Sequence, residues 1–191
     1  MSTAAARKTA NVVNGIDLDA LGGVVAEIER DPAKAIVEFR VSSQWTGQTR
    51  SEATVESCAI AGEAVKRRFT MPVDAPFELL GGNTAPNPQE YLMTALNACV
   101  MVGYVAGAAI RGIALETLEL ETTGQLDLRG LLGLDDTVRP GYESIAYTVR
   151  IKGNGTEQQF REIHETVMQT SPNYFNVSQP IRIDATLQVE R

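Results

Sequence analysis

The longest apolar stretch of the chain extends from Asn87 to Gly112, and no charged residue lies between Tyr91 and Ile110. Its start has the chemistry of a helix N-terminus. Asn87 can cap the helix, Pro88 suits the first helical position, and Glu90 can complete a capping box. Because the predicted helix is apolar on all sides, we expect it to be buried at the centre of the fold.

Alternating hydrophobic and polar positions predict strands on both sides of this helix. The six expected strands cover residues 35–45, 50–58, 65–73, 117–128, 144–152 and 181–189. Two more helices are predicted, residues 16–30 with Asp17 as cap, and residues 156–170 with a capping box of Thr156 and Gln159. Three strands before the central helix and three after it indicate an antiparallel α+β fold. We expect an N-terminal arm and helix over residues 1–34 and a single domain over residues 35–191.

Two stretches allow more than one interpretation. The central run contains Gly103 and Gly107 in a G-x-x-x-G pattern, which is also typical of a membrane-spanning helix that dimerises. Thr94 and Asn97 lie inside the run, and its many small residues dilute the hydrophobicity, so a buried core helix is the favoured interpretation. Residues 129–142 carry three leucines in a glycine-rich setting. This loop either folds over its own core or is covered by a partner subunit.

Composition excludes several classes of protein. The 191 residues carry a net charge of −7 without a basic stripe, so a nucleic-acid partner is not expected. Two cysteines and one histidine provide neither a disulfide scaffold nor a zinc site, and no nucleotide or flavin motif is present. We therefore expect no cofactor and no metal. Residues 1–14 lack the apolar core of a targeting signal, which favours a loose arm and a cytoplasmic location.

The segment N-P-Q-E-Y-L-M-T-A-L-N-A-C, which ends at Cys99, resembles the N-P-x-E-x-L-x-x-A-x-x-A-C segment of the OsmC/Ohr family. Trp45-Thr46-Gly47 looks like the turn before the second strand of that family, and Thr170-Ser171-Pro172 falls where the family usually has Cys-Pro. Residues 124–142 resemble a subgroup with a longer loop. The resemblance extends from about residue 35 to the end of the chain.

This resemblance implies an intertwined homodimer in which two antiparallel sheets enclose the central helices, with Cys99 at the subunit boundary. It also implies reduction of organic hydroperoxides by a pair of cysteines. The cysteine on the helix attacks the peroxide and becomes a sulfenic acid, and the second cysteine resolves it into a disulfide. An arginine and a glutamate hold the first cysteine as the thiolate. Arg50, soon after the turn, matches the arginine, and Arg40 is the fallback.

The chain departs from the family pattern at two positions. Gln89 stands where the peroxide-reducing branch has its glutamate, and the neighbouring Glu90 is nine residues from Cys99, on the opposite side of a helix. Glu90 is therefore assigned to the capping box, although other OsmC-like branches have a glutamate there. Ser171 stands where the resolving cysteine belongs, and a hydroxyl cannot form a disulfide.

Two functions follow from these residues. In the first, Cys99 reduces an organic hydroperoxide with help from Arg50, and an external thiol regenerates it in place of a resolving cysteine. In the second, the protein reduces no peroxide and binds a small hydrophobic or electrophilic ligand at the dimer interface. Cys58 is expected to be structural, with a non-standard resolving role as the alternative. His164 on the last predicted helix is also expected to be structural.

Overall fold

The computed structural model describes residues 11–190, so most of the predicted N-terminal arm lies outside the described residues. The chain divides into two compact units, Met1–Thr94 and Ala95–Arg191, which are described one at a time. The helix α2 (Pro88–Ile110) belongs to both, because its first turns precede the division. The division at residue 34 expected from the sequence stays a prediction.

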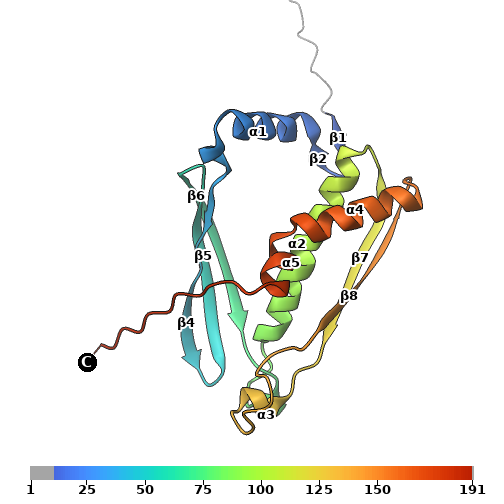
Figure 1. The fold of residues 1–191 in the computed structure, drawn as a ribbon. Helices are drawn as coiled ribbons and strands as arrows, with labels where there is room; N and C mark the ends of the chain where they lie inside the picture. The colour runs from blue at the N-terminus through green and yellow to red at the C-terminus, as the bar shows by residue number, and fades with distance from the viewer. Residues whose placement is uncertain (1–10, 191) are drawn as a thin grey trace, which may run out of the picture. The chain divides into compact units, whose positions relative to one another are not determined.

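The first unit begins with a short hairpin and a helix and continues into an antiparallel sheet (Figure 1). Asp17 caps the first helix by accepting a hydrogen bond from the backbone N–H of Ala20 at 3.0 Å, as its position predicts. The elements before α2 are β1 (Val12–Val13), β2 (Ile16–Asp17), α1 (Leu18–Arg30), η1 (Pro32–Ala35), β3 (Val37–Phe39), β4 (Ser42–Gly47), β5 (Arg50–Ile60), β6 (Glu63–Val73) and η2 (Phe77–Leu79).

The long strand β5 is the centre of this sheet. β6 pairs with one edge of β5, while β3 and β4 pair with its last and first residues respectively. The single strand predicted over residues 35–45 is therefore interrupted, and Arg40 and Val41 connect its two halves. Cys58 is 5% exposed on β5, with Phe39 and Val65 as its neighbours in register. This environment supports a structural role for Cys58.

The start of α2 has the capping box that the sequence predicts. The Asn87 side chain accepts hydrogen bonds from the backbone N–H groups of Gln89 and Glu90, at 2.9 and 3.0 Å. The Glu90 carboxylate accepts one from the backbone N–H of Asn87 at 2.7 Å. These bonds satisfy donors that a helix N-terminus otherwise leaves unpaired.

The expectation that α2 is buried on all sides is met on one face only. The buried residues Leu96, Val100, Tyr104 and Ala108 recur at every fourth position, whereas Val102 is 68% exposed and Ile110 is 63% exposed. Within residues 11–190, α2 is also the one helix that is long and apolar enough to cross a membrane, and 28% of its most apolar window is buried. Among residues 11–190, no element covers these exposed side chains.

The second unit packs α2 against later helices and a two-stranded sheet. Its elements after α2 are β7 (Leu115–Gly124), α3 (Leu128–Leu131), β8 (Ile145–Gly153), α4 (Glu157–Thr170) and α5 (Pro172–Ser178). The core joins the buried face of α2 to Ile163 and Val167 of α4, and alternate residues of β7 and β8 pack against it. The capping box of Thr156 and Gln159 at the start of α4 is present as predicted. Figure 1 shows β7 beside β8 and α4 crossing α2.

Gly103 and Gly107 allow α4 to lie close to α2. A Cβ atom at Gly103 would lie 2.9 Å from Cγ2 of Val167, and one at Gly107 would lie 3.1 Å from Cγ2 of Ile163. A side chain at Gly103 would force Val167 to shift, and one at Gly107 would press tightly on Ile163, so the G-x-x-x-G pattern has a packing role inside the unit. This contact favours the core-helix interpretation of α2 over a membrane-spanning one.

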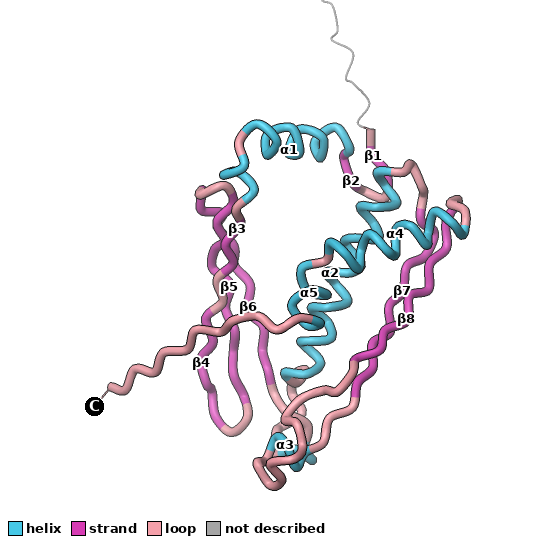
Figure 2. The backbone as a smooth tube through the Cα atoms, in the orientation of Figure 1, coloured by secondary structure: helices cyan, strands magenta, loops and turns pink. Residues whose placement is uncertain are grey.

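The strand predicted over residues 181–189 is not formed, and this part of the sequence-based fold is wrong for the single chain. Residues 179–190 follow α5 as an extended segment without a strand partner among the described residues (Figure 2). Its alternation is nevertheless clear, and the apolar side chains Ile183, Leu187 and Val189 are 81%, 87% and 74% exposed. A strand needs a neighbour for its backbone groups, and sequence alternation alone does not provide one. The antiparallel α+β class is confirmed, and the intertwined homodimer stays a prediction.

Candidate functional site

The structure brings Cys99 and Ser171 together in the second unit. Cys99 lies on α2 and is partly exposed, while Ser171 lies between α4 and α5 and is 6% exposed. The Ser171 hydroxyl donates a hydrogen bond to the Cys99 sulfur, with an Oγ to Sγ distance of 3.3 Å. The position that the resemblance assigns to a resolving cysteine is therefore in contact with Cys99, but it holds a hydroxyl.

The local sequence fixes Ser171 in place through its role at two helix ends. Its backbone N–H donates to the Val167 carbonyl at 2.9 Å and closes α4, and its Oγ accepts a long hydrogen bond, 3.4 Å, from the Tyr174 N–H at the start of α5. Pro172 follows at the first position of α5, where a missing N–H costs nothing. Asn173 adds a side-chain hydrogen bond to the Ala95 carbonyl at 2.8 Å, one helical turn before Cys99. The α4–α5 junction is thus attached to α2 beside the thiol.

The other predicted site residues lie in the first unit. Arg50 is the exposed first residue of β5, after a turn in which Gly47 has a φ of +116° that favours glycine. Gln89 and Glu90 are exposed on the first turn of α2, where Glu90 acts as the capping-box acid. Their spatial relation to Cys99 stays a prediction, and so does the contribution of Arg50 to a thiolate.

Tyr104 and His164 form a second polar contact in the core of the same unit. The Tyr104 hydroxyl is hydrogen-bonded to Nδ1 of His164, and burial raises the pKa of Tyr104 to about 12, with Tyr147 adding to the rise. Tyr147 lies close to this pair, with its ring centre 6.5 Å from that of His164. The structure supports the predicted structural role of His164. The lone histidine pointed to a hydrogen bond, but nothing in the sequence identified Tyr104 as its partner.

The Tyr147 hydroxyl is the one buried side-chain polar atom in residues 11–190 that has no hydrogen-bond partner. Burial is also the main reason that the pKa of Tyr147 is raised. Together with Tyr104, Val149, Phe160 and His164, Tyr147 lines a groove of about 690 Å³ between β8 and α4. The alternation of residues 144–152 indicates that Tyr147 shares a face with Val149, but it does not indicate that the hydroxyl lacks a partner.

Asp74 is a third polar group that sequence reasoning missed. It is fully buried in the first unit, and its carboxylate accepts hydrogen bonds from the hydroxyls of Thr49 and Thr84 and the backbone N–H groups of Ala75, Gly82 and Thr84. These hydrogen bonds, the Thr84 hydroxyl first among them, hold the pKa of Asp74 well below its usual range. The carboxylate therefore closes the loop that leads into α2.

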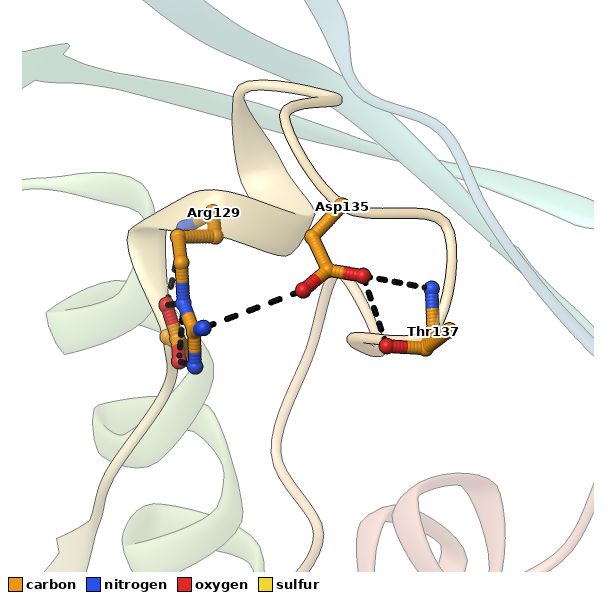
Figure 3. A network of polar contacts seen from close by, with 4 residues as sticks. Arg129, Asp135 and Thr137 are labelled. Atoms are coloured by element: carbon orange, nitrogen blue, oxygen red, sulfur yellow. Dashed lines mark hydrogen bonds and ion pairs between the residues drawn. The ribbon is translucent and has the colours of Figure 1, made fainter.

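A polar network holds the long loop between β7 and β8 (Figure 3). Arg129 pairs with Asp127 at 2.6 Å and with Asp135 at 3.7 Å, and Asp135 accepts hydrogen bonds from the backbone and hydroxyl of Thr137. Leu131, Leu132 and Leu134 of this loop are all more than half exposed. Within the single chain, the loop is held by its own polar residues and does not bury its leucines.

Solved structures share this architecture at low sequence identity. An OsmC-like protein from Mycoplasma pneumoniae matches with a TM-score of 0.56 and 15% identity, over 74% of this chain and 87% of that one. A Psychrobacter arcticus 273-4 protein, whose name refers to osmotic stress induction and detoxification, matches with a TM-score of 0.54 and 16% identity, over 70% and 84%. An OsmC-like protein of unknown function from Vibrio cholerae matches with a TM-score of 0.51 and 14% identity, over 72% and 91%. At these identities the likeness concerns the fold.

The family assignment comes from the sequence itself. No curated protein sequence matches this chain. The model of the family described as "OsmC-like protein" matches residues 81–186, more than half of the chain. The matched part contains the capped start of α2, Cys99 and Ser171. The chain belongs to the OsmC-like protein family.

Proposed function

We propose that this OsmC-like protein reduces organic hydroperoxides through Cys99 as part of oxidative-stress defence, with an external thiol as reductant. The observation that carries the proposal is a partly exposed cysteine on α2 whose sulfur accepts a hydrogen bond from Ser171. A thiolate is the reactive form of cysteine, and a hydrogen-bond donor at the sulfur stabilises it. Arg50 is the proposed cation at the site.

The chemistry requires no metal or cofactor. The Cys99 thiolate attacks one oxygen of the peroxide, the O–O bond breaks, and the leaving alkoxide takes a proton to become the alcohol. Cys99 is thereby oxidised to the sulfenic acid. Since Ser171 cannot resolve this state, an external thiol attacks the sulfur and releases water, leaving a mixed disulfide. A second external thiol then attacks the mixed disulfide, releases an external disulfide and restores Cys99.

Rapid mixing with cumene hydroperoxide tests the proposal. We expect the wild type and Cys58→Ser to consume the peroxide far faster than free cysteine does, with a trapped sulfenic acid on Cys99, while Cys99→Ser consumes none. Cys58→Ser is the matched control because it removes the other thiol, which is buried in the first unit. Oxidation of Cys99 no faster than that of free cysteine would end this proposal.

The role of Arg50 is tested by comparing Arg50→Gln with Arg40→Gln. Arg50→Gln removes the proposed cation and keeps a polar side chain of similar length, and we expect it to slow Cys99 oxidation at least about tenfold, since a nearby cation favours the thiolate. Arg40→Gln makes the same change at the arginine between β3 and β4, two residues before β4 begins. If Arg40→Gln has the larger effect, the assignment moves to Arg40.

The homodimer is part of the proposal and has separate support. The exposed apolar face of α2 and the alternating segment 181–189 both lack a covering element among the described residues. A second copy can supply one, because a strand can pair with a free sheet edge. We expect a dimer by native mass spectrometry, and a shift to monomer in Ile183→Asp/Leu187→Asp. The control Thr186→Asp/Gln188→Asp adds the same charge on the polar side and should stay dimeric. A monomeric wild type would contradict this part.

A second function, binding without turnover, is favoured by the groove between β8 and α4, whose lining includes Tyr104, Tyr147 and Phe160. Aromatic walls with a few polar groups are typical of small-ligand sites. In that case the wild type and Cys99→Ser bind the same apolar molecule equally well, and neither consumes peroxide.

Two free cysteines also fit a reducing compartment, so a cytoplasmic location remains proposed.

A further inference from the structure

We propose that Ser171 is a positioning residue that holds Cys99 in its thiolate form. This inference rests on the proposed function and deepens it. The sulfur of Cys99 lies 3.3 Å from a hydroxyl that is 6% exposed, so water competes little for the bond. A hydrogen bond to a charged acceptor is stronger than one between neutral groups, which means that the bond favours the thiolate over the thiol.

The second bond of Ser171 leaves its hydroxyl proton free for Cys99. Its Oγ accepts from the N–H of Tyr174 at 3.4 Å, and an N–H can only donate. The one hydroxyl proton is therefore available to Cys99, which has no such proton to give once it is ionised. The backbone of Ser171 is fixed by its bond to the Val167 carbonyl, so the hydroxyl cannot swing away with a mobile loop.

Asn173 completes the arrangement. Its side-chain amide donates to the Ala95 carbonyl, in the turn of α2 that directly precedes Cys99. The junction of α4 and α5 is thus joined to α2 at two points, through Ser171 to the sulfur and through Asn173 to the backbone. A serine here activates Cys99 without being able to form a disulfide with it, so the oxidised sulfur must react with a thiol from outside.

The rate of alkylation by iodoacetamide as a function of pH tests the inference without any peroxide. In a Cys58→Ser background, we expect Ser171→Ala to move the midpoint of the profile up by about one pH unit, a roughly tenfold loss of thiolate at neutral pH. Ser171→Thr keeps the hydroxyl, so its midpoint should lie close to that of the parent. Ser178→Ala is the matched control, because its hydroxyl donates a hydrogen bond to the Phe175 carbonyl on the same short helix.

A second variant tests whether residue 171 lies beside Cys99, so that the conclusion does not depend on the folding of Ser171→Ala alone. Ser171→Cys places a sulfur beside Cys99, and we expect diamide to oxidise the pair to a disulfide, seen as the loss of two hydrogen atoms in the intact mass. The inference would be overturned by absence of that disulfide, by a Ser171→Ala profile that coincides with the parent, or by an equal shift in Ser178→Ala. If the Ser171→Ala profile shifts but the wild type consumes no peroxide, the role of Ser171 stands and the proposed peroxide reduction is rejected. If the wild type consumes peroxide but the Ser171→Ala profile does not shift, peroxide reduction stands and the role of Ser171 is rejected.

Discussion

Two polar centres of the molecule, one in each unit, differ in how completely their groups are bonded. In the first unit, the buried Asp74 carboxylate accepts hydrogen bonds from two hydroxyls and three backbone N–H groups. In the second unit, Ser171 donates one bond to the partly exposed Cys99, and the Tyr147 hydroxyl is buried without a partner. A fully bonded group has no capacity left for a substrate, whereas an incompletely bonded one does. This difference separates a structural centre from a candidate reactive one.

The comparison is tested most strongly by removing the Asp74 carboxylate. Asp74→Ala removes the buried carboxylate that accepts hydrogen bonds from Thr49, Gly82 and Thr84, and the loss of several hydrogen bonds at one site is costly. We expect the thermal midpoint to fall by about 10 °C, the largest change among the substitutions discussed here. Asp136→Ala, at an exposed aspartate, is the control and should change little. Similar midpoints for the two variants would show that Asp74 is not a structural centre.

Local sequence signals predicted much of the fold but little of these two centres. The capping boxes at Asn87 and Thr156 lie within four residues of chain, so their signature can be seen in the sequence. The donors to Asp74 are mainly backbone N–H groups up to ten residues away. Almost every residue has a backbone N–H, so the sequence does not indicate which ones will bind the carboxylate. The segment 181–189 shows the complementary case, because its alternation is clear but it forms no strand among the described residues.

The candidate site was predictable to a similar extent. The resemblance placed Cys99 and Ser171 at related positions, and the structure joins them at 3.3 Å. The cap that orients Ser171 is visible only in part, since the sequence predicts the end of a helix at residue 170 but not the short helix α5 that begins at Pro172. The predicted role of Arg50 depends on how distant parts of the chain meet, which periodicity cannot provide.

The second test of the comparison is the response to acid. The pKa of Asp74 lies well below its ordinary value of 3.8 in the folded protein, because hydrogen bonds favour the charged form. The unfolded chain therefore takes up a proton that the folded protein does not, so stability present above about pH 5 is lost as the pH falls below about 4. In Asp74→Asn this loss should be smaller, although the variant starts from a lower thermal midpoint.

Thermal midpoints at pH 5, 4 and 3, the approximate range of this titration, measure the effect. Asp135→Asn is the control, because the pKa of Asp135 is also lowered, by hydrogen bonds from Thr137, but its carboxylate lies on an accessible loop. We expect Asp135→Asn to follow the wild type. Parallel curves for the wild type and Asp74→Asn would mean that Asp74 does not carry the acid response.

The smallest expected effect concerns the two tyrosines of the second unit, which differ in one hydrogen bond. Tyr104→Phe removes a hydroxyl that is bonded to His164, and we expect a loss of about 1 kcal/mol in the free energy of unfolding. Tyr147→Phe removes the unpaired hydroxyl and fills the same space, so the change should be within about 0.5 kcal/mol of zero, or slightly stabilising. Denaturant unfolding of both variants, with matched slopes, measures the difference. A larger loss for Tyr147→Phe would show that its hydroxyl has a partner in solution, and the second centre would then be as fully bonded as the first.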